Sequence, residues 1–116
     1  MDELVERLST GDHPVAVGGP NATLDELQKR LGEMGFVFVK FTETRGGTDL
    51  GFEIDRDACD TSAANFDEGK GTVHIEGLLV LNYDPVRVIA DIDLATLKGT
   101  GHLQIDDKAL ALLTEE

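Results

Sequence analysis

The chain has 116 residues and carries 23 acidic against 10 basic side chains, a formal net charge of −13. A surface this negative repels phosphate backbones and anionic headgroups, so we expect no nucleic-acid partner and no membrane partner. The one cysteine, Cys59, excludes an intramolecular disulfide framework and any multi-cysteine metal centre. An acidic start and the lack of a long apolar run predict a cytoplasmic location.

Hydrophobic residues make up 41% of the chain, as in ordinary folded proteins, and the length favours one domain over residues 1–116. The acid excess has two explanations. Carboxylates keep proteins soluble and suit a high-salt cytoplasm, a halophilic adaptation. Alternatively, an acidic face docks on a basic protein partner.

The first elements are short. Asp2–Ser9 has the apolar spacing of a helix, and Val15–Val17 is most simply a strand. A longer helix is predicted to begin at Thr23, because Thr23 and Glu26 have the spacing of a capping box. Gly35 suits the left-handed residue that ends it. The inward stripe of this helix would be Leu24, Leu27, Leu31 and Met34.

A hairpin follows. Residues 36–44 are rich in aromatic and β-branched side chains and predict a strand. Arg45-Gly46-Gly47 supplies the positive-φ positions of a tight turn. Leu50, Phe52 and Ile54 then alternate with polar or small residues, which predicts a returning strand with one solvated face.

The second half contains a loop and further strands. Residues 56–71 predict a long polar loop with Phe66 as an anchor, and residues 72–82 predict a strand. Residues 86–97 fit either a strand or a helix, and the density of β-branched residues favours a strand. Residues 99–101 predict a break, and 102–105 a short strand. Asp106 is placed to cap a final helix.

These elements predict an α+β fold: one antiparallel-rich sheet of about five to six strands packed against one main helix, with short terminal helices. Part of such a sheet is expected to curl, because long antiparallel sheets twist and close.

Two candidate binding sites follow from the predicted arrangement. The connection into the main helix, with Gly18, Gly19, Asn21 and Thr23, could offer backbone N–H groups to an anion, although it lacks the lysine or third glycine of the known phosphate loops. A small-molecule pocket could form between the curved sheet and the main helix. Its predicted lining is Phe38, Phe41 and Phe52, with His74, Glu76 and Asp91 as polar groups.

Other chemistry-bearing residues carry weaker signals. The acidic loop residues depart from an EF-hand at Cys59 and Asp60, so we assign no metal site. His13, His74 and His102 have no spacing that requires them to converge. Asp91 and Asp93 would share one face of a strand. That face is most simply exposed to solvent, and the two carboxylates are not assigned to an acid–base site. The acidic residues of the loop are Asp55, Asp57, Asp60, Asp67 and Glu68.

No catalytic or cofactor motif is recognisable, so no cofactor and no catalytic residue are assigned. We expect an accessory or binding protein that docks on a basic protein through its acidic surface. The alternative is a small-molecule-binding domain or small enzyme that uses the pocket. A homodimer paired through an edge strand, residues 49–55 or 102–105, is compatible with the docking hypothesis.

Overall fold

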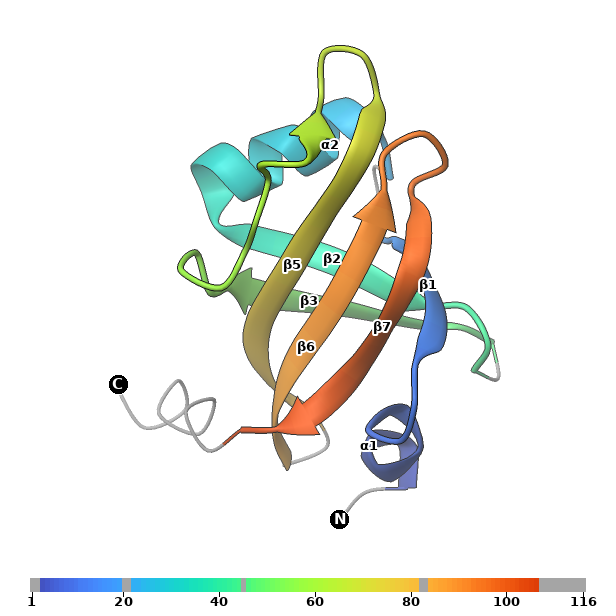
Figure 1. Ribbon diagram of the computed structural model, residues 1–116. Helices are drawn as coiled ribbons and strands as arrows, with labels where there is room; N and C mark the ends of the chain where they lie inside the picture. Colours follow the sequence, from blue (N-terminus) through green and yellow to red (C-terminus); the bar gives the residue numbers. More distant parts are fainter. Residues whose placement is uncertain (1–2, 20–21, 45, 82–83, 107–116) are drawn as a thin grey trace.

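The computed structural model describes residues 3–19, 22–44, 46–81 and 84–106. Strands account for 52% of the described residues and helices for 17%. The helices are α1 (Glu3–Leu8), α2 (Leu24–Lys29) and the π-helical turn η1 (Arg30–Met34) that continues α2. The strands are β1 (His13–Val17), β2 (Phe36–Phe41), β3 (Thr48–Ile54), β4 (Ala64–Asn65), β5 (Lys70–Leu81), β6 (Asp84–Asp93) and β7 (Lys98–Ile105) (Figure 1).

The strands form a closed antiparallel barrel of six strands in the order β3-β2-β1-β7-β6-β5. The barrel closes where β3 pairs with β5, at Glu53 opposite Leu78 and Ile54 opposite Gly77. The short strand β4 pairs with the first two residues of β5, Lys70 and Gly71. The predicted α+β sheet packed against one main helix is therefore wrong, and the chain is mostly β.

Closure follows from long, strongly twisted strands. The paired strands β5 and β6 span 12 and 10 residues, and strands of this length coil until the first and last can meet. The barrel then buries its apolar face against itself, so it does not need a helix to cover that face. The side chains that fill it include Val37, Val39, Phe41, Leu50, Phe52, Val73, Ile75, Val88, Ala90, Ile92 and Leu103.

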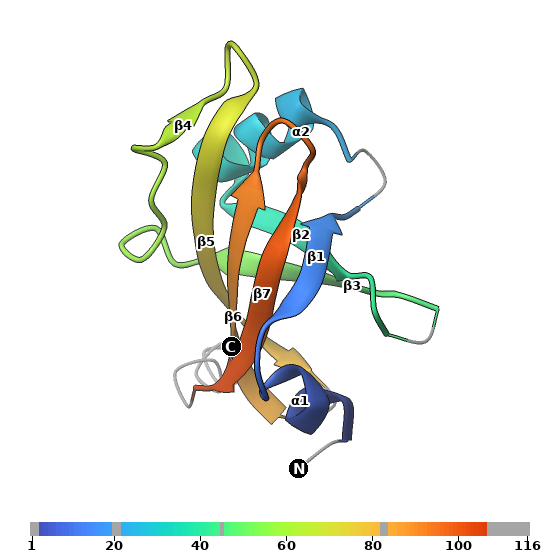
Figure 2. The ribbon, with the colours of Figure 1, turned by 45° about the vertical axis from the view of Figure 1, so that its right-hand side comes forward.

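The two helical segments lie at opposite ends of the barrel (Figures 1 and 2). Helix α2 begins at Thr23, whose hydroxyl accepts a hydrogen bond from the N–H of Glu26, and its continuation η1 ends at Gly35 with φ 67°. Both predicted helix ends are confirmed. Of the predicted stripe, Leu27 and Leu31 are buried, but Met34 is 51% exposed and does not face the core.

In the second half, the strand interpretation of residues 86–97 is confirmed for residues 86–93, which belong to β6, whereas residues 94–97 form the turn before β7. The predicted break at residues 99–101 is wrong, because β7 runs through it. A Cβ on Gly99 would overlap the carbonyl oxygen of Asp91, so these glycines allow β6 and β7 to approach closely and do not interrupt the strand. The final helix expected after Asp106 lies outside the described residues.

Of the two strands proposed as edges, β7 is paired on both sides, whereas β3 has a second partner strand only at Glu53 and Ile54. Strand β7 lies between β1 and β6, and β3 pairs with β2 along its length and with β5 at its C-terminal end. Residues 102–105 therefore present no free edge to a second copy. Among the described residues, no helix is long and apolar enough to cross a bilayer.

Candidate functional site

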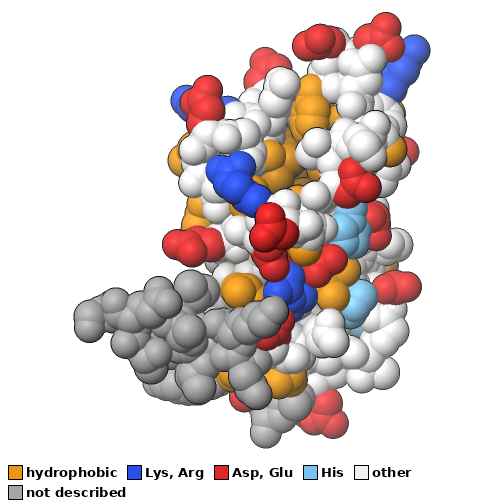
Figure 3. Space-filling model, turned by 60° about the vertical axis from the view of Figure 1, so that its left-hand side comes forward, with side chains coloured by type: hydrophobic (Ala, Val, Ile, Leu, Met, Phe, Trp, Pro, Cys, Tyr) orange, Lys and Arg blue, Asp and Glu red, His pale blue; other side chains and the backbone are white. Residues whose placement is uncertain are grey.

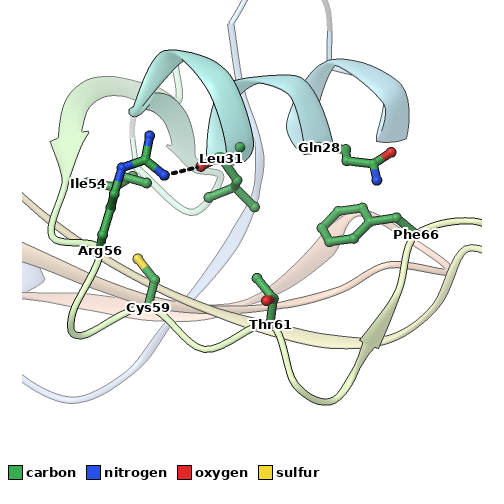
Figure 4. A pocket seen from close by; sticks show the side chains of 8 residues that line it. Gln28, Leu31, Ile54, Arg56, Cys59, Thr61 and Phe66 are labelled. Atoms are coloured by element: carbon green, nitrogen blue, oxygen red, sulfur yellow. Dashed lines mark hydrogen bonds between the residues drawn. The ribbon is translucent and has the colours of Figure 1, made fainter.

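A pocket of about 420 Å³ lies between the α2–η1 helix and the loop that follows β3 (Figure 4). We call it the helix–loop pocket. Its apolar lining is Leu31, Ile54, Cys59 and Phe66, and its polar lining is Gln28, Arg56 and Thr61, with Gly32 completing the wall. Figure 3 shows apolar side chains in a hollow on a face otherwise rich in charged groups. This size falls within the range of small-molecule sites.

The local sequence explains how the pocket is held open. The N–H of Ile54 donates to the carbonyl of Gly35 at 3.0 Å, which ties the end of β3 to the end of the helix. Beyond Ile54 the chain turns tightly, because the N–H groups of Ala58 and Cys59 both donate to the carbonyl of Asp55. Phe66 then packs against the core as the predicted anchor of the loop. The loop is thereby anchored at both of its ends beside the helix.

Arg56 lies at one end of the pocket and Phe66 at the other, as Figure 4 shows. The Arg56 guanidinium donates from Nη1 to the carbonyl oxygen of Leu31 at 2.9 Å. This carbonyl lies in the last turn of the helix, where such groups lack helical partners. Arg56 therefore has a structural role that occupies one of its five N–H donors.

Cys59 points its thiol into the pocket (Figure 4). The sulfur accepts from the N–H of Glu76 at 3.3 Å and lies 3.4 Å from its carbonyl oxygen. Burial raises the pKa of this thiol. The backbone bond to Glu76 opposes that shift, and the charge of Asp55 adds to it. Cys59 is therefore a protonated lining group at neutral pH and a weak nucleophile.

A charged network crosses the outer face of β5 and β6. His74 lies between two carboxylates: Nδ1 is 2.8 Å from Asp91 Oδ1, and Nε2 is 2.7 Å from Glu76 Oε2. The other oxygen of Glu76 accepts from Arg87 Nη1 at 3.1 Å. Figure 3 shows histidines among acidic side chains on this face. The fold thus brings together His74, Glu76 and Asp91, the three predicted polar groups, but outside the helix–loop pocket.

Two effects compete at His74. Partial burial lowers its pKa, and the hydrogen bonds and charges of Glu76 and Asp91 raise it, so the net shift of the pKa is upward. The protonated ring can donate to both carboxylates at once, whereas the neutral ring can donate to only one. His74 and Asp91 also line a smaller recess of about 210 Å³ together with Asp60, Ala63 and Thr72.

Arg87 anchors the other half of the network. It is the one charged side chain among the described residues that is buried, at 9% exposure. Its Nε donates to Asp106 Oδ2 at 2.8 Å, and Nη1 lies 3.0 Å from Asp55 Oδ2. The bond to Asp106 raises its pKa most strongly, against the opposing effect of burial. Arg87 was not among the predicted site residues, although an arginine inside the apolar run 86–90 was a sequence signal for it.

The predicted phenylalanines do not gather at either pocket. Phe41 and Phe52 are fully buried inside the barrel. Phe38 lies on the outer face, where its ring meets the edge of Phe36 at 5.4 Å and Arg30 stacks 4.9 Å from its centroid. None of the three lines the helix–loop pocket, whose aromatic residue is Phe66.

The glycine connection before α2 binds a carboxylate of the chain itself, that of Asp49. The N–H of Gly19 donates to Asp49 Oδ2 at 2.8 Å, and a Cβ on Gly18 would overlap the same carboxylate. Thr23 is used as the helix cap, and Asn21 lies outside the described residues. The backbone N–H of Gly19, which we expected to bind an anionic ligand, therefore binds Asp49 instead.

The remaining candidates have separate partners. His13 Nε2 lies 2.9 Å from the carbonyl oxygen of Thr10, and His102 Nδ1 lies 3.3 Å from Asp12 Oδ1. Asp93 accepts from the N–H of Ala95 and shapes the turn after β6. In the described part of the chain, no group of three or more His, Cys, Asp or Glu side chains could hold a metal ion.

The other acidic-loop residues are also placed. Hydrogen bonding to the hydroxyl of Ser62, and to its N–H at 2.8 Å, lowers the pKa of the Asp60 carboxyl. The backbone of Asp60 also bridges to His74. Glu68 forms a hydrogen bond with Asn65, while Asp57 and Asp67 are exposed to solvent.

In comparisons with known proteins, the chain matches neither a protein-family model nor a curated protein sequence.

Proposed function

We propose that this chain is a small-molecule-binding protein and that its ligand occupies the helix–loop pocket. The observation that carries the proposal is a concave site of about 420 Å³ with an apolar floor and a few polar groups at its rim. Concave, mostly apolar sites of this size with few convergent polar groups are typical of ligand pockets. The proposed ligand site therefore lies between the helix and the loop, and not at the phenylalanines of the sheet where the sequence predicted a pocket.

The floor of the site is supported by the core. Leu31 is only 7% exposed, and Ile54, Cys59 and Phe66 are partly buried against the same apolar cluster. A ligand there would cover apolar surface that the folded chain leaves accessible, which is the main source of affinity for small apolar molecules.

Ligand titrations followed by ¹H–¹⁵N NMR test this proposal. We expect small neutral probes such as hexanol and benzyl alcohol to shift the amide signals of Leu31, Gly32 and Cys59 in a saturable way. Replacement Thr61→Trp would fill the pocket and abolish the shifts. Thr100→Trp, on an exposed site of β7 away from the pocket, is the matched control. Shifts that are unsaturable, or unchanged in Thr61→Trp, would contradict the proposal.

A second candidate function is docking on a basic protein. The net charge of −13 supports it, together with the exposure of Asp12, Asp57, Asp67, Glu68 and Asp93. Such a surface would accelerate association with a positive partner and lose affinity as salt rises. Pull-downs at low and high ionic strength test it: a specific basic partner released by salt supports docking, and a partner set insensitive to salt argues against it.

A further inference from the structure

The helix–loop pocket has two chemically different ends. Arg56 provides a positive charge at one end, and the ring of Phe66 closes the other (Figure 4). Between them lie the apolar side chains of Leu31, Ile54 and Cys59. An elongated molecule lying along the pocket would therefore meet a cation with its head and an apolar surface with its tail.

The guanidinium of Arg56 has donors left to bind a ligand. It forms no ion pair within the described part of the chain, and its one hydrogen bond there uses Nη1. The neighbouring carboxylates have other partners: Asp55 lies against Arg87, and Asp60 accepts from Ser62. The bond to Leu31 fixes the guanidinium at the pocket edge, which reduces the entropy lost when it binds a ligand.

From this geometry we infer that the helix–loop pocket takes a small amphipathic carboxylate, whose head group pairs with Arg56 and whose apolar tail extends toward Phe66. The inference rests on the proposed function and adds the chemical class of the ligand. A carboxylate suits this position because the planar guanidinium offers paired donors to its two oxygens.

The overall charge of the chain opposes this preference only at long range. A net charge of −13 repels anions in dilute buffer, but at physiological ionic strength the screening length is about 8 Å. A carboxylate in contact with Arg56 lies well within that length, so its attraction to Arg56 is screened much less than its repulsion from carboxylates farther away. The comparison of ligands therefore belongs at physiological ionic strength.

Hexanoate and hexanol provide the test, because they share an apolar tail and differ in the head group. In the wild-type chain we expect hexanoate to bind about threefold to tenfold more tightly than hexanol by NMR titration. In Arg56→Gln this preference should disappear, because the carboxylate loses its cationic partner. Lys98→Gln, which removes one positive charge from an exposed site outside the pocket, should keep the preference.

The outcomes separate the two proposals. Equal binding of both probes to the wild type overturns the carboxylate inference and leaves the pocket proposal standing. Binding of neither probe overturns both. If Arg56→Gln also loses hexanol, Arg56→Lys decides: a retained preference for hexanoate supports the charge pairing, and a lost preference overturns it.

Discussion

The ring of Phe52 lies directly over the Cα of Gly77, at the seam where β3 meets β5. A Cβ on Gly77 would overlap both this ring and the carbonyl oxygen of Glu53. We therefore expect Gly77→Ala to lower the free energy of unfolding by about 1–3 kcal/mol, because the buried seam must shift to accept the methyl group. Urea denaturation followed by circular dichroism measures the loss.

Gly32→Ala is the matched control for this substitution. A Cβ there would meet no atom within 4 Å, and the residue lies in the helical turn η1. We expect this variant to gain about 0.5–1 kcal/mol, because alanine has less conformational entropy to lose than glycine. Equal effects of the two substitutions would show that the seam is not tightly packed.

The closed barrel explains why local sequence patterns predicted the elements better than their arrangement. Alternation in residues 50–54 and the capping box at Thr23 depend on near neighbours, and both predicted features are present. Closure depends on the pairing of Glu53 and Ile54 with residues some two dozen positions later in the chain. No periodicity reports such a pairing. The only local trace was Gly77 within an apolar strand, where a glycine indicates close approach of another backbone.

Replacement of Arg87 is expected to destabilise the barrel. Arg87 is buried and compensates the charges of Asp55, Glu76 and Asp106, which would face one another without it. We expect Arg87→Met to cost about 3 kcal/mol, at the lower end for a broken buried pair because the carboxylates are partly solvated. Urea denaturation at neutral pH measures this loss.

The same variant provides an internal check. Acidification protonates carboxylates and relieves their repulsion, so the difference between Arg87→Met and the wild type should shrink as the pH falls. A difference that stays constant with pH would mean that lost packing, and not uncompensated charge, causes the destabilisation. Arg87→Lys, which keeps the charge but not the forked geometry, should fall between the two.

His74 should make stability depend on pH near neutrality. Its folded-state pKa is raised above the ordinary 6.5, so its stabilising contribution is full below that value and is lost as the pH rises through the raised pKa. Urea midpoints between about pH 5.5 and pH 8.5 should therefore decline in the wild type. His74→Gln should flatten this decline, and Asp91→Asn should reduce it because one of the two carboxylates is removed.

The candidate site shows a similar division between local and distant information. His74 and Glu76 were placed on one strand face by their spacing, and the contact of His74 with Asp91 follows from the pairing of β5 with β6, in which these two residues lie opposite each other. The helix–loop pocket instead joins a helix to a loop about thirty residues later in the chain, through side chains such as Gln28 and Thr61 that carry no motif. Its lining could not be predicted without the barrel, because the barrel sets where the loop returns.

Cys59 should react slowly with alkylating reagents in the folded protein. Thiolate is the reactive form, and burial raises the pKa of this thiol above its ordinary value of 9.0. We expect iodoacetamide to modify the folded chain about tenfold more slowly than the urea-unfolded chain at neutral pH. Because Cys59 is the sole cysteine, mass spectrometry counts a single event. Similar rates in both states would mean that the thiol is freely exposed and does not belong to the lining of the pocket.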